Sequence, residues 1–409
     1  MPVLYNIGYL ATCRDEGEQK DVHPIRNAAL AWKNSTIEWV GLENNLPEQY
    51  KSWDQIDADK CLVIPGLIDC HTHLAFGGWR SDEFAMRMEG KSYLEIANAG
   101  GGILSTVKAT REANESELIN RCEYFLDAMT RLGITTIEAK SGYGLDTANE
   151  IKILQTYRHL NKSQPIEIVS TFLGAHTFPP EYRDDHPAYI DQIMEEMIPE
   201  VAGKQLAEFC DIFVEESAFR VGEARTIFEA AKKQGLRPKL HADQLSDGGG
   251  AALAADVGAI SADHLEHISD DGIGAMIKSG VIAVSLPIAT LYLNQPPMPA
   301  RKLIEAGVPV AVATDFNPGS APSYHLPMAM MLACTMQRMT PAEVLKGATI
   351  YAARAINRQN DRGSLEPGKR ADFAVIDAED VNEWMYHFRE QTCVSTWIKG
   401  RFIYGHSLI

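Results

Sequence analysis

The sequence lacks a long hydrophobic run: no stretch of about 18 apolar residues occurs anywhere in its 409 residues. It also lacks a basic start followed by an apolar segment, because it opens with Met1-Pro-Val-Leu-Tyr-Asn. A bilayer-spanning helix needs about 20 apolar residues, and a secretory signal needs both a basic and an apolar region. We therefore expect neither a membrane span nor a signal peptide.

Paired cysteines and excess positive charge are also missing. The 7 cysteines are scattered and odd in number, and none forms a Cys-x-x-Cys pair, which is typical of buried thiols in a reducing cytoplasm. Lys and Arg number 38 against 55 Asp and Glu, a net charge of −17. This charge argues against nucleic acids and anionic membranes as partners. A small anionic substrate would need locally placed cations. Whether the protein forms a homodimer is left open by the sequence.

The two ends of the chain have the pattern of a small β domain. Residues 28–40 predict two short strands around an Asn-Ser turn, residues 371–376 predict a strand, and residues 394–404 predict a hairpin. Neither end alone has enough apolar surface to fold as a domain. We expect a composite β-sandwich domain from residues 1–64 and 362–409, with a different domain over 65–361.

The middle of the chain alternates short apolar strands with helical periodicity. Helices are expected over 149–160 and over 340–356, the second opened by a capping box at Thr340 and Glu343. Buried parallel strands read as continuous apolar runs. This α/β pattern predicts a distorted (β/α)8 TIM-like barrel, with a doubly wound open sheet as the alternative. The expected strands are Leu62–Asp69, Thr135–Ala139, Ile166–Phe172, Asp211–Val214, Pro238–His241, Ala259–His264, Val281–Leu286 and Val310–Thr314.

The strand ends carry residues with metal-binding and acid–base chemistry. His71 and His73 lie one residue apart, and residues i and i+2 of a strand point the same way, so both imidazoles can reach one ion. The other reading is a pair of polar residues that only finish a strand. Barrel active sites gather at the carboxyl ends of the strands. Those ends, with His176 just beyond one of them, supply Glu138, Lys140, His176, Glu215, Glu216, His241, His264 and Asp315.

These motifs resemble the metal-dependent amidohydrolase superfamily. The resemblance covers essentially the whole chain, from Pro65-Gly-Leu-Ile-Asp-Cys-His71-Thr-His73 to Gly363-Ser-Leu-Glu-Pro367-Gly-Lys-Arg-Ala-Asp372. Within the superfamily, the chain is more similar to the imidazolonepropionases. That similarity rests on Phe76-Gly-Gly-Trp-Arg80, Lys140-Ser-Gly-Tyr143-Gly, Phe172-Leu-Gly-Ala-His176, His241-Ala-Asp-Gln244 and Asp315-Phe-Asn317-Pro-Gly319-Ser320.

The resemblance implies one divalent metal, Zn or Fe, held by His71, His73, His241 and Asp315. Dinuclear relatives bridge two metals with a lysine on strand four, but Phe213-Val-Glu-Glu-Ser offers none. The implied reaction hydrolyses the cyclic amide of 4-imidazolone-5-propanoate to N-formimidoyl-L-glutamate in histidine degradation. Asp315 would move the proton and His264 would orient the water. Arg80 would bind the propanoate, and the other implied substrate contacts are Tyr143, His176, Gln244, Asn317, Gly319 and Ser320.

Two other functions remain open at this point. A nucleobase-type deaminase of the same superfamily would use the same metal set, but would not need Arg80 for a carboxylate. A non-catalytic amidohydrolase-like scaffold would act through protein partners. Such scaffolds tend to lose metal ligands, whereas every expected ligand is present here.

Overall fold

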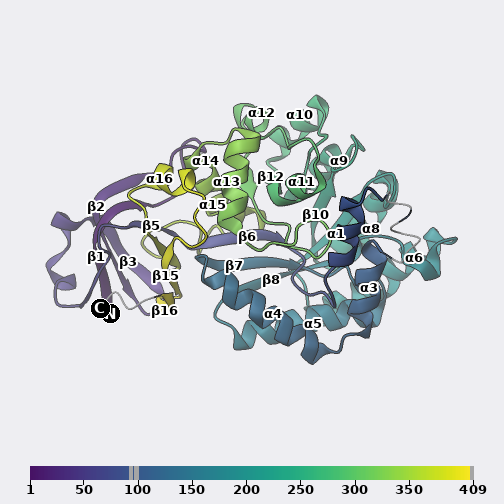
Figure 1. Cartoon of the computed structure of the whole chain (residues 1–409), viewed down its shortest axis with the longest axis horizontal. Helices are drawn as coiled ribbons and strands as arrows, with labels where there is room; N and C mark the ends of the chain where they lie inside the picture. Colours follow the sequence, from purple (N-terminus) through teal and green to yellow (C-terminus); the bar gives the residue numbers. More distant parts are fainter. Residues whose placement is uncertain (92–94, 96–100, 406–409) are drawn as a thin grey trace.

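The computed structural model describes residues 1–91, 95 and 101–405. Two eight-stranded sheets organise them, one parallel and one built from both ends of the chain (Figure 1). The strands are β1 Pro2–Ala11, β2 Pro24–Lys33, β3 Thr36–Leu42, β4 Asp54–Asp57, β5 Leu62–Pro65, β6 Leu67–Thr72, β7 Ile134–Lys140, β8 Glu167–Ala175, β9 Phe209–Val214, β10 Arg237–Ala242, β11 Ser261–His264, β12 Ile282–Ser285, β13 Val310–Val312, β14 Phe373–Ile376, β15 Cys393–Ile398 and β16 Arg401–Gly405.

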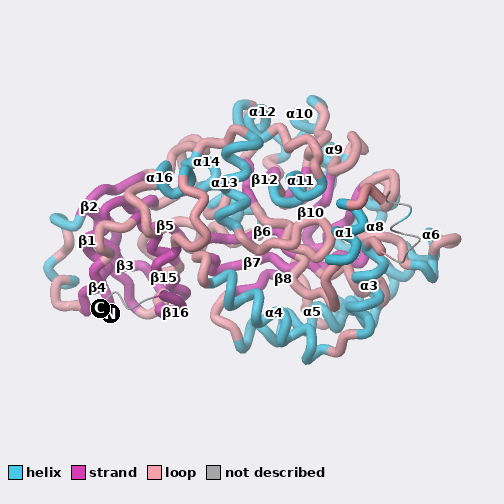
Figure 2. The backbone as a smooth tube through the Cα atoms, viewed as in Figure 1, coloured by secondary structure: helices cyan, strands magenta, loops and turns pink. Residues whose placement is uncertain are grey.

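Helices follow most strands of the parallel sheet and cover its outer side (Figure 2). None of the helices in the described ranges is both long and apolar enough to cross a bilayer. The α-helices are α1 Ser81–Met88, α3 Ile103–Glu112, α4 Glu115–Thr130, α5 Thr147–Ser163, α6 His186–Gln192, α7 Ile198–Gly203, α8 Val221–Lys233, α9 Gly250–Val257, α10 Asp270–Ser279, α11 Pro287–Leu293, α12 Ala300–Glu305, α13 Leu326–Gln337, α14 Pro341–Gly347, α15 Ile350–Ala355 and α16 Val381–Tyr386. Short helical turns lie at η1 Glu43–Asn45, η2 Glu48–Tyr50, η3 Pro180–Tyr182 and η4 Ile193–Met197.

The parallel sheet is a barrel, as the sequence predicts. Its strands follow the chain from β6 to β13, each paired in parallel with the next. The segment after β13 closes it against β6: the Asp315 amide donates to the His71 carbonyl (3.1 Å), and the His73 amide donates to the Phe316 carbonyl (2.8 Å). Beside this seam the Asp69 carboxylate accepts from the amide and the hydroxyl of Thr314, at 3.0 and 2.6 Å.

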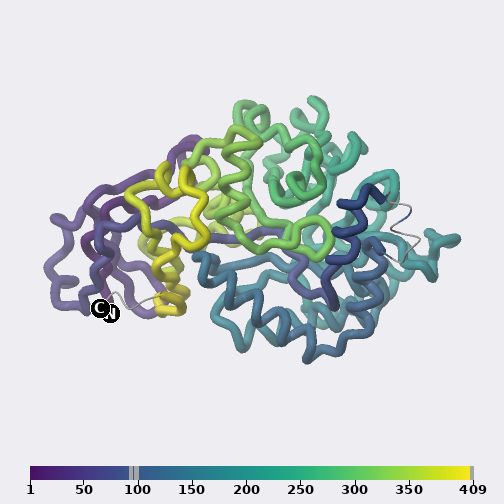
Figure 3. Tube along the Cα trace, in the orientation of Figure 1, coloured from purple at the N-terminus to yellow at the C-terminus, as the bar shows by residue number. Residues whose placement is uncertain are grey.

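The terminal sheet joins segments that lie far apart in the sequence. Its order is β16-β15-β14-β5-β1-β2-β3, with β4 beside β1, so the first and last strands of the chain share one sheet (Figure 3). The sheet curls over its own core, because Trp32 of β2 contacts Phe373 of β14 and Trp397 of β15 at ring-centroid distances of 5.1 and 5.3 Å. We propose domain boundaries at residues 64 and 362.

Two expected elements are each divided. The apolar run Leu62–Asp69 is two strands, because at Gly66 the chain leaves the terminal sheet (β5) and enters the barrel (β6). A side chain at Gly66 would collide with Thr135, so glycine alone fits this crossing. The expected helix over 340–356 breaks at Thr349 (φ −127°, ψ −96°), after which α15 begins. The Ala348 carbonyl there accepts from the Ile68 amide of β6 (2.9 Å).

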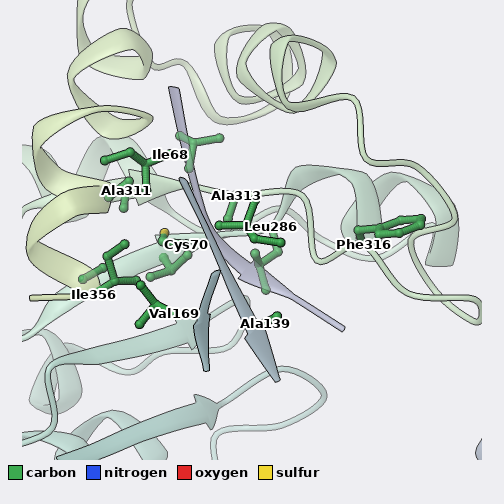
Figure 4. Close-up of a cluster of buried hydrophobic side chains, with 14 of the residues drawn as sticks. Ile68, Cys70, Ala139, Val169, Leu286, Ala311, Ala313, Phe316 and Ile356 are labelled. Atoms are coloured by element: carbon green, nitrogen blue, oxygen red, sulfur yellow. The ribbon is translucent and has the colours of Figure 1, made fainter. Parts of the chain in front are cut away.

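Alternation along β6 separates the hydrophobic packing from the polar interior of the barrel. Ile68 and Cys70 are fully buried among apolar side chains, with Ala311 and Ile356 nearby (Figure 4). The residues between and after them, Asp69 and His71, point to the opposite face. One strand therefore anchors the helical layer and supplies the polar site.

Candidate metal centre

Four histidines converge at the carboxyl ends of the barrel strands. His71 belongs to β6, His241 to β10 and His264 to β11, and His73 directly follows β6. Each of the four side chains is at most 3% exposed. The His71 and His241 rings are 4.6 Å apart between centroids, and the His241 and His264 rings 5.4 Å. The parallel strands thus bring to one place residues that are up to 193 positions apart in the chain.

Two overlapping sets of possible ligand atoms share His71. In one, His71, His73 and Asp315 present atoms that all lie within 4.8 Å of one another; in the other, His71, His241 and His264 do so. The expected ligands are thus distributed over both sets, with His73 and His241 at a ring-centroid distance of 5.5 Å. His264, expected beside the metal rather than on it, lies in the second set.

The hydrogen bonds of the histidines leave lone pairs directed at the cluster. His71 Nδ1 lies 2.6 Å from Asp263 Oδ2, and His241 Nδ1 lies 3.0 Å from Asp211 Oδ1. Because a carboxylate accepts a proton from Nδ1, the other ring nitrogen, Nε2, keeps its lone pair. Both Nε2 atoms are buried, without a hydrogen-bond partner in the part of the chain that the structure describes.

Asp315 completes an arrangement that suits a cation. Its Oδ1 lies 3.4 Å from Nε2 of His71 and 3.4 Å from Nε2 of His73. A carboxylate oxygen and buried imidazole lone pairs repel one another unless a positive charge lies between them. Neutral imidazole and carboxylate are the donor types that divalent zinc and iron accept, so these residues fit such an ion.

The electrostatics of the site keep the ligand groups ready to bind a cation. Burial lowers the pKa of His71 and of His73, which favours neutral imidazoles. Burial by itself would raise the pKa of Asp315. Its contact with His73 and the nearby His264 lower the pKa by more, so the pKa is below its usual value and the carboxylate is ionised. For His264 the opposite balance holds: burial lowers its pKa and Glu266, 3.7 Å away, raises it by more.

The backbone is strained at two of the site residues. His264 has φ 79° and Asp315 has φ 56°, a left-handed backbone conformation that residues other than glycine rarely adopt. Each residue turns the chain sharply at the end of its strand, and such strain accumulates at functional sites. The turns direct both side chains toward the cluster.

A cavity of about 160 Å³ opens above the cluster. The predicted substrate-contact residues are brought together here, except that Gly319 is not part of the wall. Ile103 and Phe213, which sequence reasoning did not single out, add apolar surface. The complete lining is His73, Arg80, Ile103, Tyr143, His176, Phe213, His241, Gln244, His264, Asp315, Asn317 and Ser320.

Arg80 already binds a carboxylate in this structure. Its guanidinium donates twice to Glu83, from Nε at 2.8 Å and from Nη2 at 2.6 Å, in the fork geometry that carboxylates favour. Gly319 lies directly against this guanidinium, and a Cβ at that position would collide with Arg80. The absence of a side chain at 319 therefore leaves room for the arginine.

The other expected substrate contacts differ in how freely they face the cavity. The His176 ring stacks on His73 at a centroid distance of 5.1 Å, and its Nδ1 is 3.0 Å from the Gly142 carbonyl. The Asn317 side chain, in contrast, is used inside its own loop: its Oδ1 accepts from the Gly319 and Ser320 amides, both at 2.8 Å. Asn317 thus shapes the loop after Asp315.

Asp211 and Asp263 are functional partners that the sequence analysis missed. Each is fully buried in a barrel strand and holds one histidine of the cluster. Lys140, expected as a strand-end residue and as part of the Lys140-Ser-Gly-Tyr143-Gly motif, lies between them, 2.7 Å from Asp211. The signal was available: a charged residue inside an otherwise apolar strand needs a buried partner.

Comparison with known proteins agrees with this geometry. The sequence model of the Amidohydrolase family matches residues 62–403. The chain belongs to this family. It is 50% identical to the imidazolonepropionase of Geobacillus thermodenitrificans (strain NG80-2) over 91% of this chain and 88% of that protein. It is 45% identical to the imidazolonepropionase of Fusobacterium nucleatum subsp. nucleatum over 98% of each.

Solved structures with the same fold include two deaminases. An adenosine deaminase from Xanthomonas campestris with bound zinc superposes with a TM-score of 0.71 at 15% identity, covering 98% of this chain and 92% of that one. A 5-methylcytosine deaminase from Klebsiella pneumoniae gives 0.74 at 14% identity, covering 99% and 97%. At these identities the likeness concerns the fold alone. As an amidohydrolase, the chain is a metal-dependent hydrolase that acts on a small molecule.

Proposed function

We propose that this enzyme hydrolyses the cyclic amide of 4-imidazolone-5-propanoate to N-formimidoyl-L-glutamate, a step of histidine degradation. The relatives named imidazolonepropionase supply the reaction. The structural observation that carries the proposal is a cavity with an arginine in its wall and, at its floor beside Asp315, buried imidazole nitrogens that have no hydrogen-bond partner among the described residues. The arginine suits a substrate carboxylate, and the imidazole nitrogens with Asp315 suit a metal that activates water for hydrolysis of a ring amide.

We propose that one divalent ion, Zn or Fe, is held by His71, His73, His241 and Asp315. The mixed imidazole and carboxylate donors accept either metal. Such an ion would supply Lewis-acid activation of a water molecule for attack on a carbonyl carbon. His71 and His241 would bind through Nε2, because Asp263 and Asp211 hold their Nδ1 atoms.

In this proposal Asp315 carries out the proton transfers and His264 assists them. Asp315 accepts a proton from the water as the water oxygen bonds to the ring carbonyl carbon. The ring C–N bond then breaks, and Asp315 returns the proton to the leaving nitrogen. His264, buried beside the cluster, orients the water and stabilises the negative charge on the carbonyl oxygen.

The cavity wall would bind the two ends of the substrate. Arg80 lies in the wall and presents a fork of donors, so it would bind the propanoate carboxylate once that group displaces Glu83. Around the ring, Tyr143, His176 and Gln244 offer polar groups. The 317–320 loop would meet the carboxylate of the product through Ser320, with Asn317 and Gly319 setting its shape.

One assay tests substrate, reaction and metal together. Purified protein is incubated with 4-imidazolone-5-propanoate while formimidoylglutamate and ammonia are measured, and the same sample undergoes elemental analysis. We expect ring opening without ammonia, about one Zn or Fe per chain, and loss of activity on chelation. Ammonia release from a nucleobase would instead identify a deaminase, and a metal-free, inactive protein would identify a scaffold.

We also propose a cytoplasmic location for the enzyme. All seven cysteines are free thiols in the structure, as expected for a reducing compartment. The net charge of −17 supports the absence of nucleic-acid and membrane partners. A homodimer stays a prediction, which light scattering on the purified protein would test.

A further inference from the structure

A single ammonium group lies among three carboxylates inside the barrel. Lys140 Nζ is 2.8 Å from Glu138 Oε1, 2.7 Å from Asp211 Oδ2 and 3.7 Å from Asp263 Oδ2. All four side chains are completely buried, and they come from β7, β9 and β11. The interior of a barrel of this kind is ordinarily filled by branched apolar side chains.

Two of these carboxylates also hold the histidines of the metal centre. Asp211 uses Oδ2 for Lys140 and Oδ1 for His241, whereas Asp263 lies against His71 through Oδ2. Lys140 therefore connects His241 and His71 through one carboxylate on each side. Ser261 fixes the other oxygen of Asp263 with a hydrogen bond of 2.6 Å.

We propose that Lys140 is a positioning residue of the metal centre: it holds Asp211 and Asp263 together, so that His241 and His71 present their Nε2 atoms to the same ion. This inference rests on the proposed metal-dependent function. It assigns Lys140 no contact with substrate or metal, but a role through the two carboxylates.

The physical reason lies in the crowding of negative charge. Without the ammonium, Glu138, Asp211 and Asp263 would face one another in a medium of low dielectric, and like charges at such distances repel strongly. The carboxylates would move apart, and each would turn the imidazole that it holds. Partners of this kind orient metal-binding histidines, and their removal typically costs 10- to 100-fold in metal affinity.

Stability alone is a poor explanation for this cluster. A buried ion pair contributes little net stability, because desolvation offsets most of the attraction between the charges. Two other lysines, Lys239 and Lys346, are also fully buried, and Lys239 serves as a comparison. Lys239 of β10 donates to the Ala355 carbonyl (3.1 Å), a contact that does not involve the histidines. It is a matched control for burial and charge.

The test compares Lys140→Met with Lys239→Met in the full-length protein. Zn²⁺ affinity is measured by competition with a chromophoric chelator, and thermal unfolding is recorded on the same samples. We expect Lys140→Met to weaken Zn²⁺ binding about 10- to 100-fold. Lys239→Met should change the unfolding temperature but leave Zn²⁺ affinity within about twofold of wild type. Wild-type affinity in Lys140→Met, or an equal loss in Lys239→Met, would overturn the inference.

Two further measurements keep the inference testable if Lys140→Met does not fold. Lys140→Gln keeps a polar side chain of similar length and should show the same loss of Zn²⁺ affinity. In the metal-free wild type, ¹⁵N NMR should find the proton of His71 and of His241 on Nδ1; a proton on Nε2 of either would contradict the proposal. If the wild type itself binds no metal, the proposed function fails, whereas tight binding in both wild type and variant removes only the role of Lys140.

Discussion

At the scale of single residues, the site combines charges that are held in place with one charge that must be exchanged. Asp315 is held at the barrel seam by the hydrogen bond from its amide to the His71 carbonyl (3.1 Å), and its Oδ1 lies 3.4 Å from Nε2 of His71 and of His73. Arg80 instead binds Glu83, which a substrate carboxylate would have to displace. The two residues should therefore affect different kinetic constants.

We expect Asp315→Asn to lower kcat by about 10²- to 10⁴-fold, because an amide cannot accept the proton. Steady-state kinetics with 4-imidazolone-5-propanoate measures this, and elemental analysis of the same sample shows whether the metal is retained. A variant that keeps its metal and turns over like wild type would exclude the proton role.

For Arg80→Met we expect KM to rise by about 10-fold or more, with a smaller change in kcat, because a charge-assisted hydrogen-bonded pair contributes about 1.5–3 kcal/mol. A ring analogue without the propanoate tail should lose much less. Arg87→Met is the matched control, since Arg87 lies on α1, the helix that Arg80 directly precedes, and packs over Tyr292 at 5.1 Å. Equal losses for both compounds would mean that Arg80 does not bind the tail.

The residues of the site could be predicted from the sequence where their place in the site follows from their position on a strand. The His71 and His73 pair and Asp315 lie at strand ends, and parallel strands bring such ends together whatever the details. Asp211 and Asp263 were not found, because their importance depends on which strand neighbours which histidine across the barrel. The pairing of Arg80 with Glu83 likewise depends on a helix start that the sequence does not mark.

At the scale of elements, the sequence correctly predicts helix starts whose hydrogen bonds form between residues a few positions apart. The capping box at the start of α14 is present as expected: Thr340 accepts from the Glu343 amide, and Glu343 accepts from the Thr340 amide (2.7 Å). The breaks at Gly66 and Thr349 were missed for the opposite reason. They are set by Thr135, Asp372 and Ile68, which contact them from elsewhere in the chain.

Thr340→Ala should lower the free energy of unfolding by about 1 kcal/mol, since an unsatisfied helix start costs about 0.5–2 kcal/mol. Urea denaturation followed by circular dichroism measures the change. Thr226→Ala is the control, because Thr226 is exposed inside α8 and caps nothing. It should stay within about 0.5 kcal/mol of wild type. A similar loss in both variants would show that the cap is not the cause.

At the scale of the whole molecule, a cluster of charges joins the base of the barrel to the segment that leads into the terminal sheet. Glu167, at the start of β8, is 3.0 Å from Arg362 and 2.6 Å from Arg370. Arg362 is nearly fully buried and also donates to Thr136 of β7 (2.9 Å). Burial would raise the pKa of Glu167, but the arginines lower it to about 2.

This shift predicts a pH-dependent contribution to stability. The pKa of Glu167 is lower in the folded protein than its ordinary value of 4.5, so its contribution is present above pH 4.5 and is lost as the pH falls toward about 2. The pKa falls from 4.5 to about 2, and at about 1.4 kcal/mol per pKa unit the contribution is roughly 3–4 kcal/mol. Glu167→Gln should therefore destabilise the protein at neutral pH and differ less from wild type in acid.

Calorimetry at about pH 7 and about pH 3 measures the difference in unfolding temperature between the two proteins, because pH 3 lies inside the range over which the contribution is lost. Glu208→Gln is the control. Glu208 likewise pairs with an arginine, Arg358, but its side chain is 48% exposed, and exposed ion pairs contribute little to stability. A difference between Glu167→Gln and wild type that does not shrink in acid would contradict the shifted pKa.

The seam of the barrel has a consequence for synthesis on the ribosome. His71 and His73 are made early, but Asp315 and the strand-closing hydrogen bonds to β6 arrive more than 240 residues later. A nascent chain can therefore present histidines to free metal long before it can enclose the ion. In the proposed metal site, the ion can be enclosed only after Asp315 has emerged, which would place metal loading late in synthesis.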